Sequence, residues 1–67
     1  MKLVNRTTGA EIKIDDEAVT FMGERVIVLG FTPPHSPISS GRVHLKFIAI
    51  NYIREFYPSV IDAKIVE

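Results

Sequence analysis

Hydrophobic and polar residues alternate along most of this chain. A repeat of two residues places every second side chain on one face, so it predicts β-strands with a single buried face. In the first half of the chain, short strands are expected at residues 2–5, 11–15 and 18–21. Within the second of these strands, Ile12 and Ile14 are expected to point inward. Tight turns are expected to join these strands into antiparallel pairs.

Two longer strands are predicted in the middle of the chain. Residues 25–32 are apolar on both faces, which is typical of a central strand. One face is predicted to carry Ile27, Leu29 and Phe31, and the other Val26 and Val28. Residues 42–47 alternate more strictly. Their inward side chains are predicted to be Val43, Leu45 and Phe47, and their outward ones Arg42, His44 and Lys46.

The segment from residue 48 to residue 57 fits either a strand or a helix. Ile48, Ile50 and Tyr52 fit a continuing strand, whereas the apolar residues Phe47, Ile50, Ile53 and Phe56 or Tyr57 fit one face of a helix. β-branched isoleucines favour the strand, but the sequence leaves both structures open. Pro58 ends the segment, because a proline keeps the residue before it out of the α region. Residues 61–65 alternate and are predicted to form the last strand.

These elements predict an all-β fold. Five or six short strands with frequent turn signals are typical of a small antiparallel barrel or sandwich. A chain of 67 residues is long enough for one domain, which we expect to span residues 1–67. Closure into a barrel suits this length because it removes sheet edges that would otherwise aggregate.

Two short segments support a particular barrel. Residues 56–61, Phe-Tyr-Pro-Ser-Val-Ile, resemble the stretch of SH3 domains in which a Pro-Ser turn precedes the last strand. The acidic run at residues 15–17 lies roughly where that family carries an acidic loop. The resemblance implies an SH3-like barrel with a short 3-10 turn near Pro58. The chain has no tryptophan, and it lacks the tyrosine motif of that family's first strand, so the resemblance implies architecture and not the binding of proline-rich peptides.

Composition and charge narrow the function classes. Hydrophobic residues make up 46% of the chain, which indicates a packed globule, although a core of this size gives little net stability. There is no cysteine, so neither a disulfide nor a thiolate metal site can stabilise the fold. Eight basic and eight acidic residues give a formal net charge of zero. This balance argues against a generic nucleic-acid binder and permits self-association.

The start of the chain carries no targeting signal that we recognise. Residues 1–6 become polar too early for a signal peptide, and no apolar run approaches the roughly 20 residues that span a bilayer. We therefore expect a cytoplasmic protein without a membrane partner.

Residues 30–41 interrupt the alternation between the two longest strands. Three prolines and several turn residues cannot continue either ladder, so the chain must leave the sheet and return. Prolines also reduce the conformational freedom of the unfolded loop. The loop is therefore either a stiffened connection or a preorganised contact surface for a protein, and Ile38 must be buried against the chain itself or a partner. The residues predicted to bind a partner are Phe31, Pro33, Pro34, His35, Ile38 and Tyr57.

A basic stripe gives a second candidate site. Small β-barrels bind single-stranded nucleic acid with a cationic groove and stacking aromatic rings. The residues that would form such an interface are Arg42, His44, Lys46 and Arg54. Cross-strand pairing with outward Glu11 and Asp15 explains the same stripe without any ligand, and it is the interpretation that we favour.

No motif predicts catalysis, a cofactor or a metal site. His35 lies among serines, but there is no Gly-x-Ser-x-Gly nucleophile motif. His35 and His44 form no recognised metal-ligand spacing with residues 15–17. The leading hypothesis is a non-enzymatic interaction or structural module that associates with itself or with a larger protein through the proline-rich loop.

Overall fold

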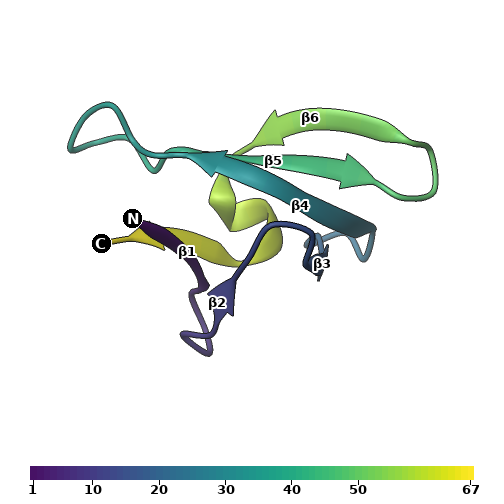
Figure 1. Cartoon of the computed structure of the whole chain (residues 1–67), viewed down its shortest axis with the longest axis horizontal. Coiled ribbons are helices and arrows are strands. Elements are labelled where there is room, and N and C mark those ends of the chain that lie inside the picture. The colour runs from purple at the N-terminus through teal and green to yellow at the C-terminus, as the bar shows by residue number, and fades with distance from the viewer.

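The computed structural model describes all residues from Met1 to Glu67 and contains only strands, turns and one short 3-10 helix (Figure 1). The elements are β1 (Lys2–Asn5), β2 (Glu11–Ile12), β3 (Glu17–Val19), β4 (Arg25–Thr32), β5 (Arg42–Phe47), β6 (Tyr52–Phe56), the 3-10 helix η1 (Pro58–Ile61) and β7 (Ala63–Val66). The prediction of an all-β fold is confirmed.

The strands form two antiparallel sheets that lie as two layers. One sheet has the order β2-β1-β7, and the other has the order β3-β4-β5-β6. Figure 1 shows η1 between the two layers, near the middle of the molecule. Because no strand ladder joins the two sheets, the predicted single closed barrel is not confirmed, and seven strands replace the five or six expected.

A turn at residues 13–16 separates the two sheets along the chain. Asp15 has a positive φ of 74°, which an extended strand does not allow. The Asp16 carboxylate accepts the backbone N–H of Lys13 at 2.9 Å and stabilises this turn. The predicted strand at 11–15 therefore stops at Ile12, and the prediction that Ile14 points inward is wrong because Ile14 lies in the turn and is exposed.

A bulge in β4 changes which side chains share a face. Val28 lies opposite Leu45 and Gly30 lies opposite His44, so Leu29 is an extra residue without a partner on β5. One extra residue reverses the alternation beyond it. Phe31 therefore joins Val26 and Val28 on the inner face of the sheet, and its predicted grouping with Ile27 and Leu29 is wrong.

The core lies between the two sheets. The inner faces of both sheets contribute small and branched apolar side chains, and the 3-10 helix contributes Ile61. The eight buried core residues are Leu3, Val26, Val28, Val43, Leu45, Phe47, Ile61 and Ala63. The inward orientation predicted for alternate residues of β5 is confirmed.

The turn between β3 and β4 begins at Thr20, within the strand that the sequence predicts at residues 18–21. Thr20 is buried, and its hydroxyl accepts the backbone N–H groups of Met22 and Glu24 at 3.3 and 3.2 Å. These bonds close the turn early, so β3 ends at Val19 and Phe21 is exposed. The strand predicted at 18–21 is thus displaced toward the N-terminus.

The segment left open by the sequence forms a turn and a strand. Residues 48–51 turn, with Asn51 at a positive φ of 52°, and β6 then pairs with β5. The 3-10 helix predicted near Pro58 is present, and it includes Ile61. The last strand therefore begins at Ala63 rather than at residue 61. No helix in the structure has the length and apolar character required to cross a membrane.

Asp62 links the two ends of the chain. It follows η1 in the left-handed conformation, and its carboxylate accepts hydrogen bonds from the Thr7 hydroxyl and from Arg6 Nε. Its carbonyl oxygen also accepts the backbone N–H of Arg6 at 2.9 Å. These contacts fix the β1–β2 turn against the start of β7, beside the pairing of β1 with β7.

Candidate functional site

The proline-rich loop projects beyond the four-stranded sheet at one end of the molecule (Figure 1). Ile38 lies in this loop and is 97% exposed, so it does not fold back onto its own core. His35 is also exposed, and Pro34 is half-buried. The loop therefore presents an apolar side chain to solvent, and its role as a contact surface stays a prediction.

The base of the loop is held in one conformation by Gly41. This residue is buried, its φ is 78°, and a Cβ atom at this position would lie 2.6 Å from the carbonyl oxygen of Thr32. Its N–H donates to the hydroxyl of Ser39, and the N–H of Ser39 donates to the carbonyl of Ser36. Only glycine combines this close approach with this backbone conformation. The contacts position the loop on the end of β4.

Arg42 and Tyr57 meet beside the base of this loop. The guanidinium carbon of Arg42 lies 4.1 Å from the centre of the Tyr57 ring, which is the geometry of a cation–π contact. Nη1 of Arg42 donates to the carbonyl oxygen of Gly41 at 2.9 Å. Arg42 is half-buried and forms no ion pair, whereas Tyr57 remains 56% exposed. A fixed cation therefore lies next to an exposed aromatic ring.

A polar hollow opens between the loop and Arg42. Its volume is about 250 Å³, and its walls contain no acidic residue. The lining residues are Thr32, Pro33, His35, Ser39, Gly41 and Arg42. In chemical terms the hollow offers a guanidinium, hydroxyl groups and an imidazole. We refer to the exposed part of the loop together with Arg42, Tyr57 and this hollow as the loop surface.

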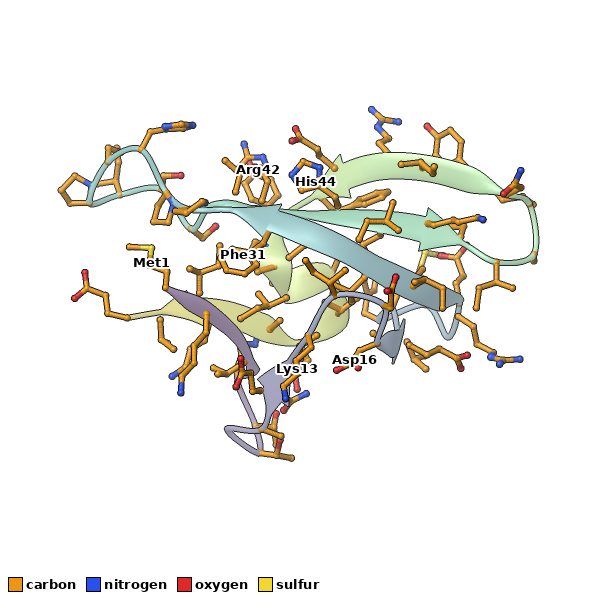
Figure 2. The ribbon with its side chains drawn as sticks, viewed as in Figure 1. Met1, Lys13, Asp16, Phe31, Arg42 and His44 are labelled. Carbon is orange, nitrogen blue, oxygen red and sulfur yellow. The ribbon has the colours of Figure 1, made fainter.

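Phe31 does not belong to the loop surface. It lies opposite Val43 and packs against the core, because of the bulge in β4. Figure 2 shows Phe31 directed toward the other sheet, whereas Arg42 and His44 point away from it. Of the six residues predicted to bind a partner, Phe31 thus lies on the inner face of the sheet, opposite to the face that carries Tyr57.

Three of the four residues predicted to form a basic face lie on the same face of the sheet, and the fourth does not. Arg42, His44 and Lys46 share the outer face of β5, as expected from their spacing. Arg54 lies opposite Leu45 and so belongs to the other face. There Nη1 of Arg54 donates to the hydroxyl of Tyr52 at 3.2 Å.

His44 is engaged with residues of both neighbouring strands. Its Nε2 atom lies 2.9 Å from the hydroxyl oxygen of Thr32 and 3.4 Å from a carboxylate oxygen of Glu55. Glu55, and not the predicted Glu11 or Asp15, supplies the cross-strand acidic partner, because those two residues lie outside the four-stranded sheet. The carboxylate interrupts the positive stripe.

Sequence reasoning missed the contact between Arg42 and Tyr57. Arg42 begins β5 and Tyr57 directly follows β6, so their contact continues the register in which Val43 lies opposite Phe56. The sequence left residues 48–57 open between strand and helix, so this register was not predicted. Sequence reasoning also missed the role of Gly41, although a glycine that ends a loop after two serines is a recognisable turn signal. No three His, Asp or Glu side chains converge where they could hold a metal ion.

A second hollow lies at the opposite end of the molecule. It has a volume of about 330 Å³ and is formed by residues 23–25 and 47–50. Ile48 and Ile50 are exposed beside it, in the turn between β5 and β6. None of the predicted site residues lies there, so this turn provides control positions far from the loop surface (Figure 1).

Comparisons of this chain with known protein families, with curated proteins and with solved structures found no match.

Proposed function

We propose that this protein is a non-enzymatic interaction module that associates with itself or with a larger protein through the loop surface. The observation that carries the proposal is Ile38, an isoleucine that is 97% exposed on a loop with a fixed base. Burying such a side chain contributes roughly 1.5–3 kcal/mol. Because prolines and Gly41 already restrict the loop, association costs little additional ordering.

We also propose that the fold is an SH3-like arrangement in which the two sheets pack without full closure. Three features support this. The first and last strands pair, β4, β5 and β6 form a meander, and a 3-10 helix precedes the last strand. In this arrangement the β4–β5 loop and the residue before the 3-10 helix lie next to each other, as Arg42 and Tyr57 do.

Sedimentation velocity over about 10 μM to 1 mM tests the self-association form of the proposal. The range covers affinities on the order of millimolar or tighter, which correspond to about 4 kcal/mol or more. We expect the weight-average sedimentation coefficient to rise with concentration and Ile38→Ser to reduce that rise. Ile50→Ser, which changes an exposed isoleucine at the far end of the molecule, is the matched control.

Amide NMR spectra recorded over the same dilution series locate the contact. Resonances of residues 33–41 and of Tyr57 should move with concentration more than the rest of the spectrum. Equal effects of the two isoleucine substitutions would contradict a role for the loop. A monomer at every concentration, together with no binding to any partner offered, would count against the whole proposal.

The alternative function is binding of single-stranded nucleic acid by the outer face of β5. The shared orientation of Arg42, His44 and Lys46 favours it. It is the weaker candidate because Arg54 lies on the other face and Glu55 contacts His44. Titration with a fluorescent oligothymidine at low salt distinguishes the two functions, because phosphate binding weakens steeply as salt is added.

A further inference from the structure

Of the four arginines, Arg42 and Arg54 have no acidic partner, and of these two only Arg42 is half-buried. Arg6 pairs with Asp62 at 2.7 Å, and Arg25 pairs with Glu17 at 2.9 Å. Arg42 is half-buried, and its guanidinium contacts the carbonyl oxygen of Gly41 and the face of Tyr57. A partly desolvated guanidinium without a counter-charge is a favourable binding position for an anion.

The two contacts of Arg42 leave part of its guanidinium free for a ligand. Nη1 is directed to the carbonyl oxygen of Gly41, and the ring of Tyr57 covers one face of the plane. The remaining N–H donors are not used by any hydrogen bond within the chain. Since the stack and the hydrogen bond already fix the side chain, binding loses less side-chain freedom than at a mobile surface arginine.

The surroundings of Arg42 suit an anion on one side and an apolar group on the other. The hollow beside it is lined by polar or small residues without a carboxylate, and Ser39 and His35 contribute additional polar groups. Tyr57 is exposed beside Arg42, and Ile38 is exposed on the adjoining loop. An arginine and an aromatic ring flanked by apolar contacts are typical of the residues that dominate protein interfaces.

We infer that the loop surface recognises a peptide segment of a partner protein through one carboxylate, which Arg42 binds, with apolar side chains of that segment against Tyr57 and the loop residue Ile38. This inference rests on the proposed function and names the chemistry of the partner. A single fixed guanidinium suits a single carboxylate, which it can bind with two parallel hydrogen bonds. A polyphosphate strand requires several free cations in a row, and here Glu55 contacts the next residue of the stripe, His44.

Selection from a display library of random twelve-residue peptides on the immobilised protein tests this inference. We expect the selected peptides to share an aspartate or glutamate next to an apolar residue. For a selected peptide, replacement of that acid by its amide should weaken binding roughly tenfold, the usual loss for a hydrogen bond to a charged group.

Variants of the protein identify the cation. Arg42→Gln should weaken the same peptide roughly tenfold, and Arg42→Lys should weaken it in part because lysine keeps the charge but loses the planar donor pair. Arg54→Gln is the matched control, since Arg54 lies on the other face of the sheet. Amide NMR spectra of each variant confirm that it is folded, and the Arg42 Nε–H resonance reports contact with the peptide directly.

Three results of the peptide selection and the variants would overturn the inference. They are peptides that bind without an acidic residue, acid-dependent binding that Arg42→Gln leaves unchanged, and failure to select any peptide. Displacement of a selected peptide by oligothymidine in a salt-dependent manner would instead favour a phosphate site and also contradict the inference. None of these results alters the effect of Ile38→Ser on sedimentation, so failure of the inference and failure of the proposed function are distinguishable.

Discussion

Gly41 is the residue on which the shape of the loop surface depends most directly. It brings the end of the loop against the backbone of Thr32 and Pro34, and its carbonyl oxygen receives the Arg42 side chain. Two separate properties of glycine are used here, the positive φ and the absence of a Cβ atom. The first is needed at several turns of the chain, whereas the second is needed only where other atoms approach closely.

Comparison of Gly41→Ala with Gly23→Ala separates these two properties. Both positions have a φ near +80°, but no atom lies within 4 Å of the position of a Cβ at Gly23. We expect Gly23→Ala to lower the free energy of unfolding by about 1–2 kcal/mol, the cost of the left-handed backbone. Gly41→Ala should lower it by about 2–4 kcal/mol because a steric clash is added.

Urea denaturation followed by far-UV circular dichroism measures both glycine variants. Equal losses would show that the loop base relaxes around a methyl group, which would contradict the fixed conformation of the loop surface. Amide NMR of folded Gly41→Ala should in addition show displaced resonances for Arg42 and Tyr57.

At the scale of elements, Asp62 connects the β1–β2 turn with η1 and β7. The hydrogen bond from the Thr7 hydroxyl, and then that from Arg6, hold the pKa of the Asp62 carboxyl below its usual value of 3.8. A proton therefore binds this group more weakly in the folded chain than in the unfolded chain. The resulting stabilisation is present above about pH 4, and it is lost as the pH falls through the lowered pKa.

Asp62→Asn is expected to destabilise the protein at neutral pH and to make its unfolding less dependent on pH below about 4. Asparagine tolerates the left-handed backbone, so the substitution mainly removes the charge. Thermal unfolding measured at intervals from pH 7 to pH 2 checks this expectation. The control is Asp15→Asn, which removes a carboxylate without an ion pair at another positive φ. A slope in Asp62→Asn equal to that of the wild type would contradict the assignment.

The elements also show which parts of the fold the sequence can predict. β4 and β5 were predicted with their observed bounds because long alternating segments are flanked by strong turn residues. The bulge in β4 was not predictable, because Leu29 is as apolar as the residues around it and only the pairing with β5 reveals it as extra. The turn at Asp15 interrupts an alternating segment through its backbone conformation, which leaves no trace in the hydrophobic pattern.

The candidate site was predictable to a smaller extent. Ile38 could be identified because an isoleucine among prolines and serines has no strand to bury it. The stack of Arg42 on Tyr57 could not, since it depends on the register of β5 with β6, in a segment that the sequence left open between strand and helix.

For the whole molecule, stability depends on a core of eight buried residues. A chain of this length is expected to have a free energy of unfolding of roughly 3–10 kcal/mol. Leu45 is fully buried between the sheets, and truncation of such a leucine to alanine costs about 2–5 kcal/mol. One such substitution is thus comparable with the total stability of the protein.

We therefore expect Leu45→Ala to lower the free energy of unfolding by about 2–5 kcal/mol, and Ile50→Ala, at an exposed site, to change it by about 0.5 kcal/mol or less. Amide NMR dispersion and urea denaturation distinguish these outcomes. A Leu45→Ala protein with the unfolding midpoint of the wild type would show that the packing between the sheets contributes little.

The pairing of β1 with β7 brings the two ends of the chain together, with Lys2 opposite Val66 (Figure 1). A short linker can therefore join the ends, and new termini can be opened in an exposed turn such as residues 48–51 without breaking a strand ladder. For the same reason the fold can be inserted into a surface loop of a host protein, whose own chain would enter and leave at nearly the same point. Because the two chain ends lie at the same end of the molecule as the proline-rich loop, the host would lie beside the loop surface in such a fusion (Figure 1).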